Sequence, residues 1–170
     1  MRVSIRSTAS VAALLLVCVI LSFSQGARKP GVVASDDLKS IVPSSYFFRG
    51  QSATVQLRNA AAIRTKDGHY VLAAMVDTSG YASDVAQKYQ GLFITEVKIK
   101  VGDSDLPVGA YGFGFTGEKF VVADVGANDV LSAGSAKDDQ LKRAVPLKIV
   151  EDGDGYRLYA GKKYVSIRIP

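Results

Sequence analysis

Few residues in this 170-residue chain have the types and spacing that chemistry requires. Asp77 and Asp124 each follow an apolar run with the composition of a strand, so the two carboxylates could meet at one rim of a sheet. Paired carboxylates are the catalytic groups of most glycoside hydrolases. A small hydrolase that uses this pair, with or without the single histidine His69, is therefore one alternative.

Other features argue against an enzyme. The chain lacks Trp, which sugar-binding clefts commonly use for stacking, and it has no Gly-x-Ser-x-Gly nucleophile elbow. One histidine cannot assemble a conventional zinc site, and Asp152-x-Asp154 lacks the closing Glu of a calcium loop. Gly112-x-Gly114-x-x-Gly117 matches the dinucleotide fingerprint, but a strand rather than a helix is predicted after it. We therefore expect no catalytic set, no metal site and no cofactor.

A charge within an apolar strand is another kind of candidate. Arg58 interrupts a run of small and apolar residues, next to Asn59. If its side chain points inward, the guanidinium needs a partner, because an unpaired buried charge is costly. Asp77 or Asp124 could supply the carboxylate. A structural ion pair is the favoured interpretation and an anion-binding site is the alternative.

The segment 106–116 is the most suggestive of a binding surface. Tyr111 and Phe113 point to one face of the predicted strand, and Gly112 and Gly114 point to the other. Glycine within a strand marks a bend or a close approach of other atoms. The simpler interpretation is a curved strand whose aromatic side chains fill the core. The alternative is a ligand on the glycine face, or a pocket lined by the aromatic side chains. The candidate ligand-binding residues of the whole chain are Arg58, Asp77, Tyr111, Phe113 and Asp124.

The elements that must position these residues are predicted to be strands. Alternating and continuous apolar runs recur at regular spacing between Gly- and Asp-containing turns, and no long helical period is present. This pattern predicts an all-β, mainly antiparallel fold: a small β-sandwich or barrel of about eight strands with one or two short helices. Strands are expected at 52–63, 70–76, 92–101, 108–116, 120–125, 147–150, 156–159 and 164–169, helices at 35–41 (N-cap Ser35) and 82–89, and a long loop at 126–144.

The N-terminus has the three parts of a cleavable secretory signal peptide. Arg2 and Arg6 give a positive start, and residues 11–21 form an almost unbroken apolar run. Small residues then allow cleavage after Gly26 or after Ser24. The apolar run is about half of what a membrane span needs. We expect an exported protein, periplasmic or extracellular, with no membrane span after cleavage.

Cleavage changes what the working chain contains. Removal of residues 1–26 leaves 144 residues, takes away the only cysteine, Cys18, and lowers the formal net charge from +5 to +3. Disulfides are then impossible, and the scattered basic residues do not form a nucleic-acid footprint. The absence of cysteine and of Asn-x-Ser/Thr sites favours a bacterial envelope protein. We divide the chain into the signal peptide (1–26), an N-terminal lead with a short helix (27–50) and a β-domain (51–170).

One short segment also carries a resemblance. Leu106-Pro107-Val108-Gly109-Ala110-Tyr111 resembles the Leu-Pro-x-Gly-x-Tyr pattern of exported bacterial β-rich proteins of unknown function. The resemblance implies an envelope β-domain and brings no catalytic residues with it. The leading expectation is an exported, non-enzymatic β-domain that binds a small ligand or an envelope protein, or has a structural role in the cell envelope. A solid core without a pocket would argue against the small ligand.

Overall fold

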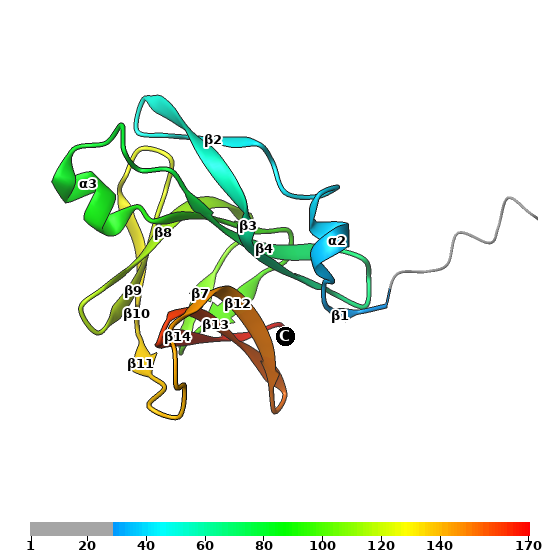
Figure 1. Cartoon of the computed structure of the whole chain (residues 1–170). Coiled ribbons are helices and arrows are strands. Elements are labelled where there is room, and N and C mark those ends of the chain that lie inside the picture. Colours follow the sequence, from blue (N-terminus) through cyan, green and yellow to red (C-terminus); the bar gives the residue numbers. More distant parts are fainter. Residues whose placement is uncertain (1–28) are drawn as a thin grey trace, which may run out of the picture.

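The computed structural model describes residues 29–170, and the predicted signal peptide (1–26) lies outside them. The described chain forms two packed sheets (Figure 1), which confirms the expected all-β, mainly antiparallel fold and, of the two expected architectures, is a sandwich rather than a barrel. It has fourteen strands and two short helices, against about eight strands predicted. The excess arises because several strands have only two to four residues, and such short runs show no periodicity in the sequence.

The first sheet has eight strands, all in antiparallel pairs. Its tight hairpins follow from glycine at positions that need a positive φ. Gly117 (φ +58°) starts the two-residue turn before Lys119, and Gly50 (φ +85°) ends the turn before Gln51. In order, the sheet contains β1 (Gly31–Val32), β3 (Gln51–Arg64), β4 (Tyr70–Val76), β5 (Gly91–Thr95), β8 (Gly109–Thr116), β9 (Lys119–Ala123) and β10 (Asp129–Gly134), and β2 (Ser45–Phe48) pairs with β3.

The second sheet has six strands and lies below the first in Figure 1. Its hairpins also turn on glycine, and Gly153 (φ +60°) followed by Asp154 connects the paired residues Asp152 and Gly155. The Asp152-x-Asp154 sequence is therefore a hairpin turn. The order is β12 (Val145–Asp152), β13 (Gly155–Gly161), β14 (Lys163–Arg168), β6 (Ile99–Val101) and β7 (Ser104–Leu106), and β11 (Ala136–Lys137) pairs with β14.

The prediction of one strand at 92–101 is wrong. The chain forms β5 in the first sheet, leaves it after Thr95, and enters the second sheet as β6. The Thr95 hydroxyl is buried and donates to the Val97 carbonyl at 2.5 Å within the crossing. Alternation continues through the crossing because both halves face the same core, so the period alone could not reveal the change of sheet.

The prediction of a long loop at 126–144 is also wrong, because β10 and β11 lie within it. β10 pairs with β9 and buries only two side chains, Leu131 and Ala133, between exposed neighbours. Small and polar residues make up most of this strand, so its hydrophobic signal is weak. Tertiary pairing rather than local preference creates β10.

The main core lies between the sheets and is filled by side chains. Four phenylalanines meet there in tilted and edge-on contacts, with ring centroids 5.0–6.4 Å apart. Aliphatic side chains from both sheets surround them. The largest members that are almost fully buried are Phe93, Phe113, Phe120, Ile63, Ile99, Leu106, Leu158 and Ile167.

A second apolar cluster covers the outer face of the first sheet. Phe48 of β2 stacks on Tyr89 at 3.9 Å between centroids, directly over Gly112. A Cβ at Gly112 would lie 2.6 Å from Phe48 Cε2, so only glycine lets the rings approach the sheet. Buried Leu38 joins the same cluster. β1 and β2 pair with β3, so residues 31–32 and 45–48 are hydrogen-bonded to the first sheet.

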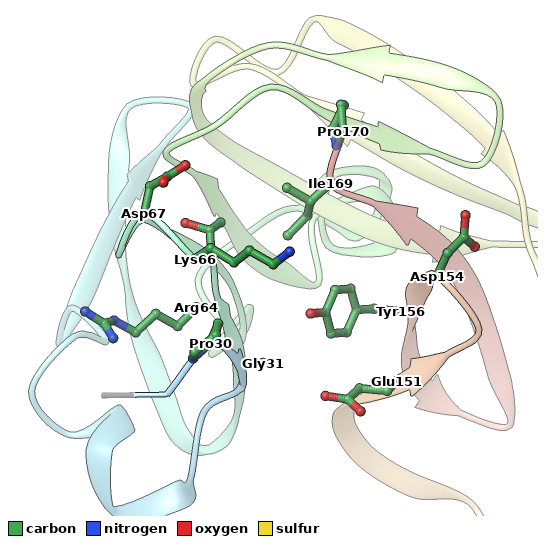
Figure 2. Close-up of a pocket in the computed structure, with 11 residues that line it drawn as sticks. Pro30, Gly31, Arg64, Lys66, Asp67, Glu151, Asp154, Tyr156, Ile169 and Pro170 are labelled. Atoms are coloured by element: carbon green, nitrogen blue, oxygen red, sulfur yellow. The ribbon is translucent and has the colours of Figure 1, made fainter. Parts of the chain in front are cut away.

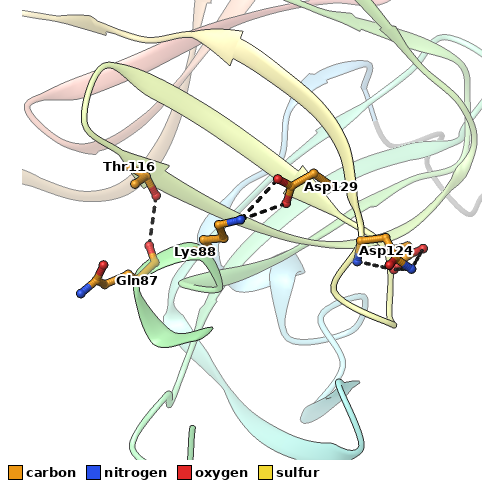
Figure 3. Close-up of polar contacts among 6 residues, drawn as sticks. Gln87, Lys88, Thr116, Asp124 and Asp129 are labelled. Atoms are coloured by element: carbon orange, nitrogen blue, oxygen red, sulfur yellow. Dashed lines mark hydrogen bonds and ion pairs between the residues drawn. The ribbon is translucent and has the colours of Figure 1, made fainter. Parts of the chain in front are cut away.

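Two short helices complete this covering layer. α2 (Ser35–Leu38) and α3 (Ser83–Lys88) lie within the predicted helical segments. Ser35 is the first helical residue of α2 and Ala34 is the N-cap, so the expected serine cap is wrong. Figure 3 shows how α3 is fixed: Lys88 pairs with Asp129 at 3.3 Å, and Thr116 donates to the Gln87 carbonyl at 3.2 Å.

Candidate functional site

The predicted carboxylate pair does not come together. β4, which ends before Asp77, and β9, which ends before Asp124, are separated by β5 and β8 in an antiparallel sheet. An odd number of direction reversals makes β4 and β9 antiparallel to each other. The two strands therefore run toward their aspartates in opposite directions. The register aligns Ala123, just before Asp124, with Ala74 across β8 and β5, so Asp124 does not lie beside Asp77 and the two carboxylates share no rim.

Each of these carboxylates instead orders its own turn. Asp77 accepts a hydrogen bond from the Ser79 backbone N–H at 3.0 Å, which lowers the pKa of Asp77. Asp124 accepts from the Asn128 side chain and backbone and from the Gly126 N–H, all within 3.2 Å (Figure 3). These contacts lower the pKa of Asp124, the Asn128 side chain first. Both groups are turn formers.

The other predicted site residues are either buried in the core or exposed at the surface. Arg58 is exposed where the β3–β4 register is irregular, so its charge is not buried and the premise of an internal ion pair fails. Tyr111 and Phe113 are buried in the core between the sheets, as the simpler interpretation expected. The Tyr111 hydroxyl donates to the Pro107 carbonyl at 3.1 Å. His69 is half exposed, 3.9 Å from Glu96.

The strongest candidate site is a cleft of about 520 Å³ at one end of the sandwich. The first sheet contributes one wall, formed by β1 and the turn after β3, and the second sheet contributes the other, formed by the β12–β13 hairpin and the residues after β14 (Figure 2). Its volume lies in the range of small-molecule sites. The lining residues are Pro30, Gly31, Arg64, Thr65, Lys66, Asp67, Glu151, Asp154, Tyr156, Ile169 and Pro170.

One polar side chain on the first wall of the cleft faces two on the second wall. In Figure 2 the Lys66 ammonium extends from the first wall toward the second, where the Glu151 carboxylate and the Tyr156 hydroxyl point into the gap. The Arg64 guanidinium points away from the gap. Glu151 and Tyr156 are direct partners in the β12–β13 ladder, so they stand side by side next to the tight turn that ends the hairpin.

Backbone geometry sets the position of these groups. Lys66 lies in a turn closed by two backbone hydrogen bonds, in which the Thr65 N–H donates to His69 and the Gly68 N–H donates to Thr65. On the β1 side, a Cβ at Gly31 would lie 3.1 Å from Glu151 Oε1. Glycine at this position, with its φ of +117°, leaves room for the carboxylate.

Two electrostatic features of the cleft bear on ligand binding: the protonation state of Tyr156 and the pairing of the charged side chains. Burial, and then the charge of Glu151, raise the pKa of Tyr156, so its hydroxyl stays protonated and can donate. Within residues 29–170, none of Lys66, Asp67, Glu151 and Asp154 takes part in an ion pair. Lys66, Asp67, Glu151 and Asp154 thus line one hollow without forming ion pairs with one another.

None of the residues that line this cleft is identified as a binding residue by the sequence analysis. The lining comes from four short segments, 30–31, 64–67, 151–156 and 169–170, that only the packing of the two sheets brings together. The one signal in the sequence was the hairpin turn chemistry, which placed Lys66 and Asp154 at loop tips but did not place them beside each other.

Several other findings bear on function. Among the residues that the structure describes, no group of three or more His, Cys, Asp or Glu side chains could hold a metal ion. No helix within 29–170 combines the length and the apolar character needed to cross a bilayer. No known protein family, curated protein or solved structure matches this chain.

Proposed function

We propose that this chain is an exported, non-enzymatic β-sandwich protein of the bacterial envelope that binds a small polar ligand in the cleft between its sheets. Support for export comes from the positively charged Arg2 and Arg6, the apolar run of residues 11–21 and the small residues that follow it. An envelope protein as partner is the alternative to the small ligand. The cleft favours the ligand, because it is a hollow of suitable size rather than a flat surface.

One observation carries the proposal: Lys66 and Glu151 lie on opposite walls of the cleft and do not pair with each other. Elsewhere on the surface, charges of opposite sign do pair, as Lys98 and Lys100 do with Asp105 at 2.7 and 3.1 Å. In the cleft, Lys66 and Glu151 face each other and form no ion pair. A ligand that enters between them gains charge-assisted hydrogen bonds without first breaking a protein ion pair.

The remaining architecture supports binding rather than catalysis. The interior between the sheets is filled by aromatic and aliphatic side chains, so it offers no buried reaction chamber. None of the residues that line the cleft is a histidine, cysteine or serine, so the cleft holds none of the Ser–His or Cys–His pairs that activate a nucleophile. Polar groups that converge on an open hollow suit reversible recognition of a polar molecule.

A screen of small polar molecules by NMR tests the proposal. The exported protein, labelled with ¹⁵N, is titrated with sugars, amino acids, short peptides and organic acids, and backbone amide shifts are mapped. We expect at least one class to shift residues 64–67 and 151–156 together. The double variant Lys66→Ala/Glu151→Ala should lose these shifts, whereas Lys98→Ala/Asp105→Ala, which removes an ion pair elsewhere on the surface, should keep them. Shifts that survive loss of Lys66 and Glu151 would contradict the proposal.

A further inference from the structure

The charges of the cleft define a ligand class. Building on the proposed function, we propose that the cleft binds a small zwitterion, an amino acid or short peptide, with its ammonium at Glu151 and its carboxylate at Lys66. The two side chains reach the gap from opposite walls, one from each sheet (Figure 2). A ligand that carries both charges can therefore bridge the two sheets.

The ammonium end is recognised on the second wall. Glu151 offers carboxylate oxygens and adjacent Tyr156 offers a hydroxyl oxygen, so the pair supplies acceptors for a primary ammonium. The carboxylate of Glu151 also lies against β1 at Gly31, which restricts where its oxygens can point. Asp154, at the hairpin turn of the same wall, adds negative potential around the entrance.

The carboxylate end is recognised on the first wall. The ammonium of Lys66 is the cation that points into the gap, whereas Arg64 points away from it. Lys66 projects from a turn that backbone hydrogen bonds close, so its base is held while its long side chain can adapt. The Tyr156 hydroxyl can donate a second hydrogen bond to a carboxylate that lies between the two walls.

Ligands with a single charge fit the cleft less well. A purely anionic ligand would pair with Lys66 but would cover Glu151 and remove its water without replacing the lost hydrogen bonds. A purely cationic ligand would do the same to Lys66. A volume of about 520 Å³ exceeds what one small amino acid fills, which leaves space for a peptide of a few residues.

Blocked peptides test this class directly. The exported protein is titrated with triglycine, N-acetyl-triglycine, triglycine amide and N-acetyl-triglycine amide, and dissociation constants are taken from the ¹⁵N–¹H NMR shifts of residues 64–67 and 151–156. We expect triglycine to bind best. Loss of either terminal charge should weaken binding about tenfold or more, as expected for a charge-assisted hydrogen bond.

Matched variants assign each end of the peptide. In Glu151→Gln, triglycine and N-acetyl-triglycine should bind with similar affinity, because the acceptor for the ammonium is gone. In Lys66→Gln, triglycine and triglycine amide should become similar. Glu118→Gln and Lys162→Gln, which change hairpin-turn residues outside the cleft, should keep the full preference.

The outcomes separate the ligand class from the binding function. Equal binding of all four peptides in the cleft, or shifts there only with uncharged sugars or with organic acids, would overturn the zwitterion and leave the proposed function standing. Failure of every polar class to shift residues 64–67 and 151–156 would overturn both.

Discussion

Substitution of Gly112 by alanine tests the packing that closes the outer face of the first sheet. The added Cβ would lie 2.6 Å from Phe48 Cε2 and 2.8 Å from Tyr89 Cδ2, whereas ordinary contacts begin near 3.4 Å. Both rings are almost fully buried and stacked on each other, so neither can move alone. Overpacking of this kind costs about 2 kcal/mol. For a domain of this size, that loss corresponds to a fall in Tm of about 6 °C.

Urea and thermal unfolding, followed by circular dichroism, measure this loss. Gly134→Ala is the matched control, because a Cβ there meets nothing within 4 Å and the strand position has ordinary φ. Its stability should stay within about 0.5 kcal/mol of wild type. A smaller side chain at Phe48 should rescue Gly112→Ala in part, so Phe48→Leu should cost less when combined with Gly112→Ala than alone. If Gly112→Ala proves as stable as Gly134→Ala, the close contact between rings and sheet is refuted.

Three further predictions concern buried and turn-forming groups. Tyr89→Phe should raise the free energy of unfolding by about 1 kcal/mol in urea titrations, because the Tyr89 hydroxyl is buried without a hydrogen-bond partner in the described part of the chain; a loss of more than about 1 kcal/mol would contradict this. Burial raises the pKa of Tyr46 to about 12. The stability that depends on the neutral phenol should therefore be present below pH 10 and be lost as the pH rises through about 12. An absorbance titration of Tyr46→Phe should lack the phenol ionisation near pH 12 that the wild-type protein shows. The pKa of Asp124 is lowered, so its contribution to the free energy of unfolding should be present above about pH 4 and be lost as the pH falls through the folded-state pKa. Asp124→Asn should therefore make stability depend less on pH in the acid range. A pH dependence that stays unchanged in this variant would argue against the turn contacts.

The parts of the fold that sequence reasoning predicted are those with a strong local pattern. The continuous apolar run 70–76 corresponds to β4, because this strand is covered on both faces. Glycine and aspartate at 153–154 marked a tight hairpin for a local steric reason. The change of sheet after Thr95 and the pairing of β10 depend on contacts between distant segments, which no local period encodes.

The candidate site shows the same division. Gly112 and Gly114 predict either a bend or a close approach of other atoms, and the atoms that approach them belong to Phe48, Tyr89 and the backbone of α3. Carboxylates after apolar strands suggested a shared rim, but β4 and β9 run in opposite directions with β5 and β8 between them, so the two carboxylates do not meet. The cleft depends on how two sheets stack, so its residues carry no pattern in the sequence.

The most direct test of ligand binding in the cleft uses the natural mixture of molecules. The ¹⁵N-labelled protein is mixed with a low-molecular-mass extract of the producing cells, and its ¹⁵N–¹H NMR spectrum is compared with that of Lys66→Ala/Glu151→Ala. We predict that shifts in the wild-type protein cluster at residues 30–31, 64–67, 151–156 and 169, and that they vanish in the double variant. No shifts in the wild-type protein, or shifts that lie elsewhere and persist in the variant, would contradict the assignment of the cleft as the binding site.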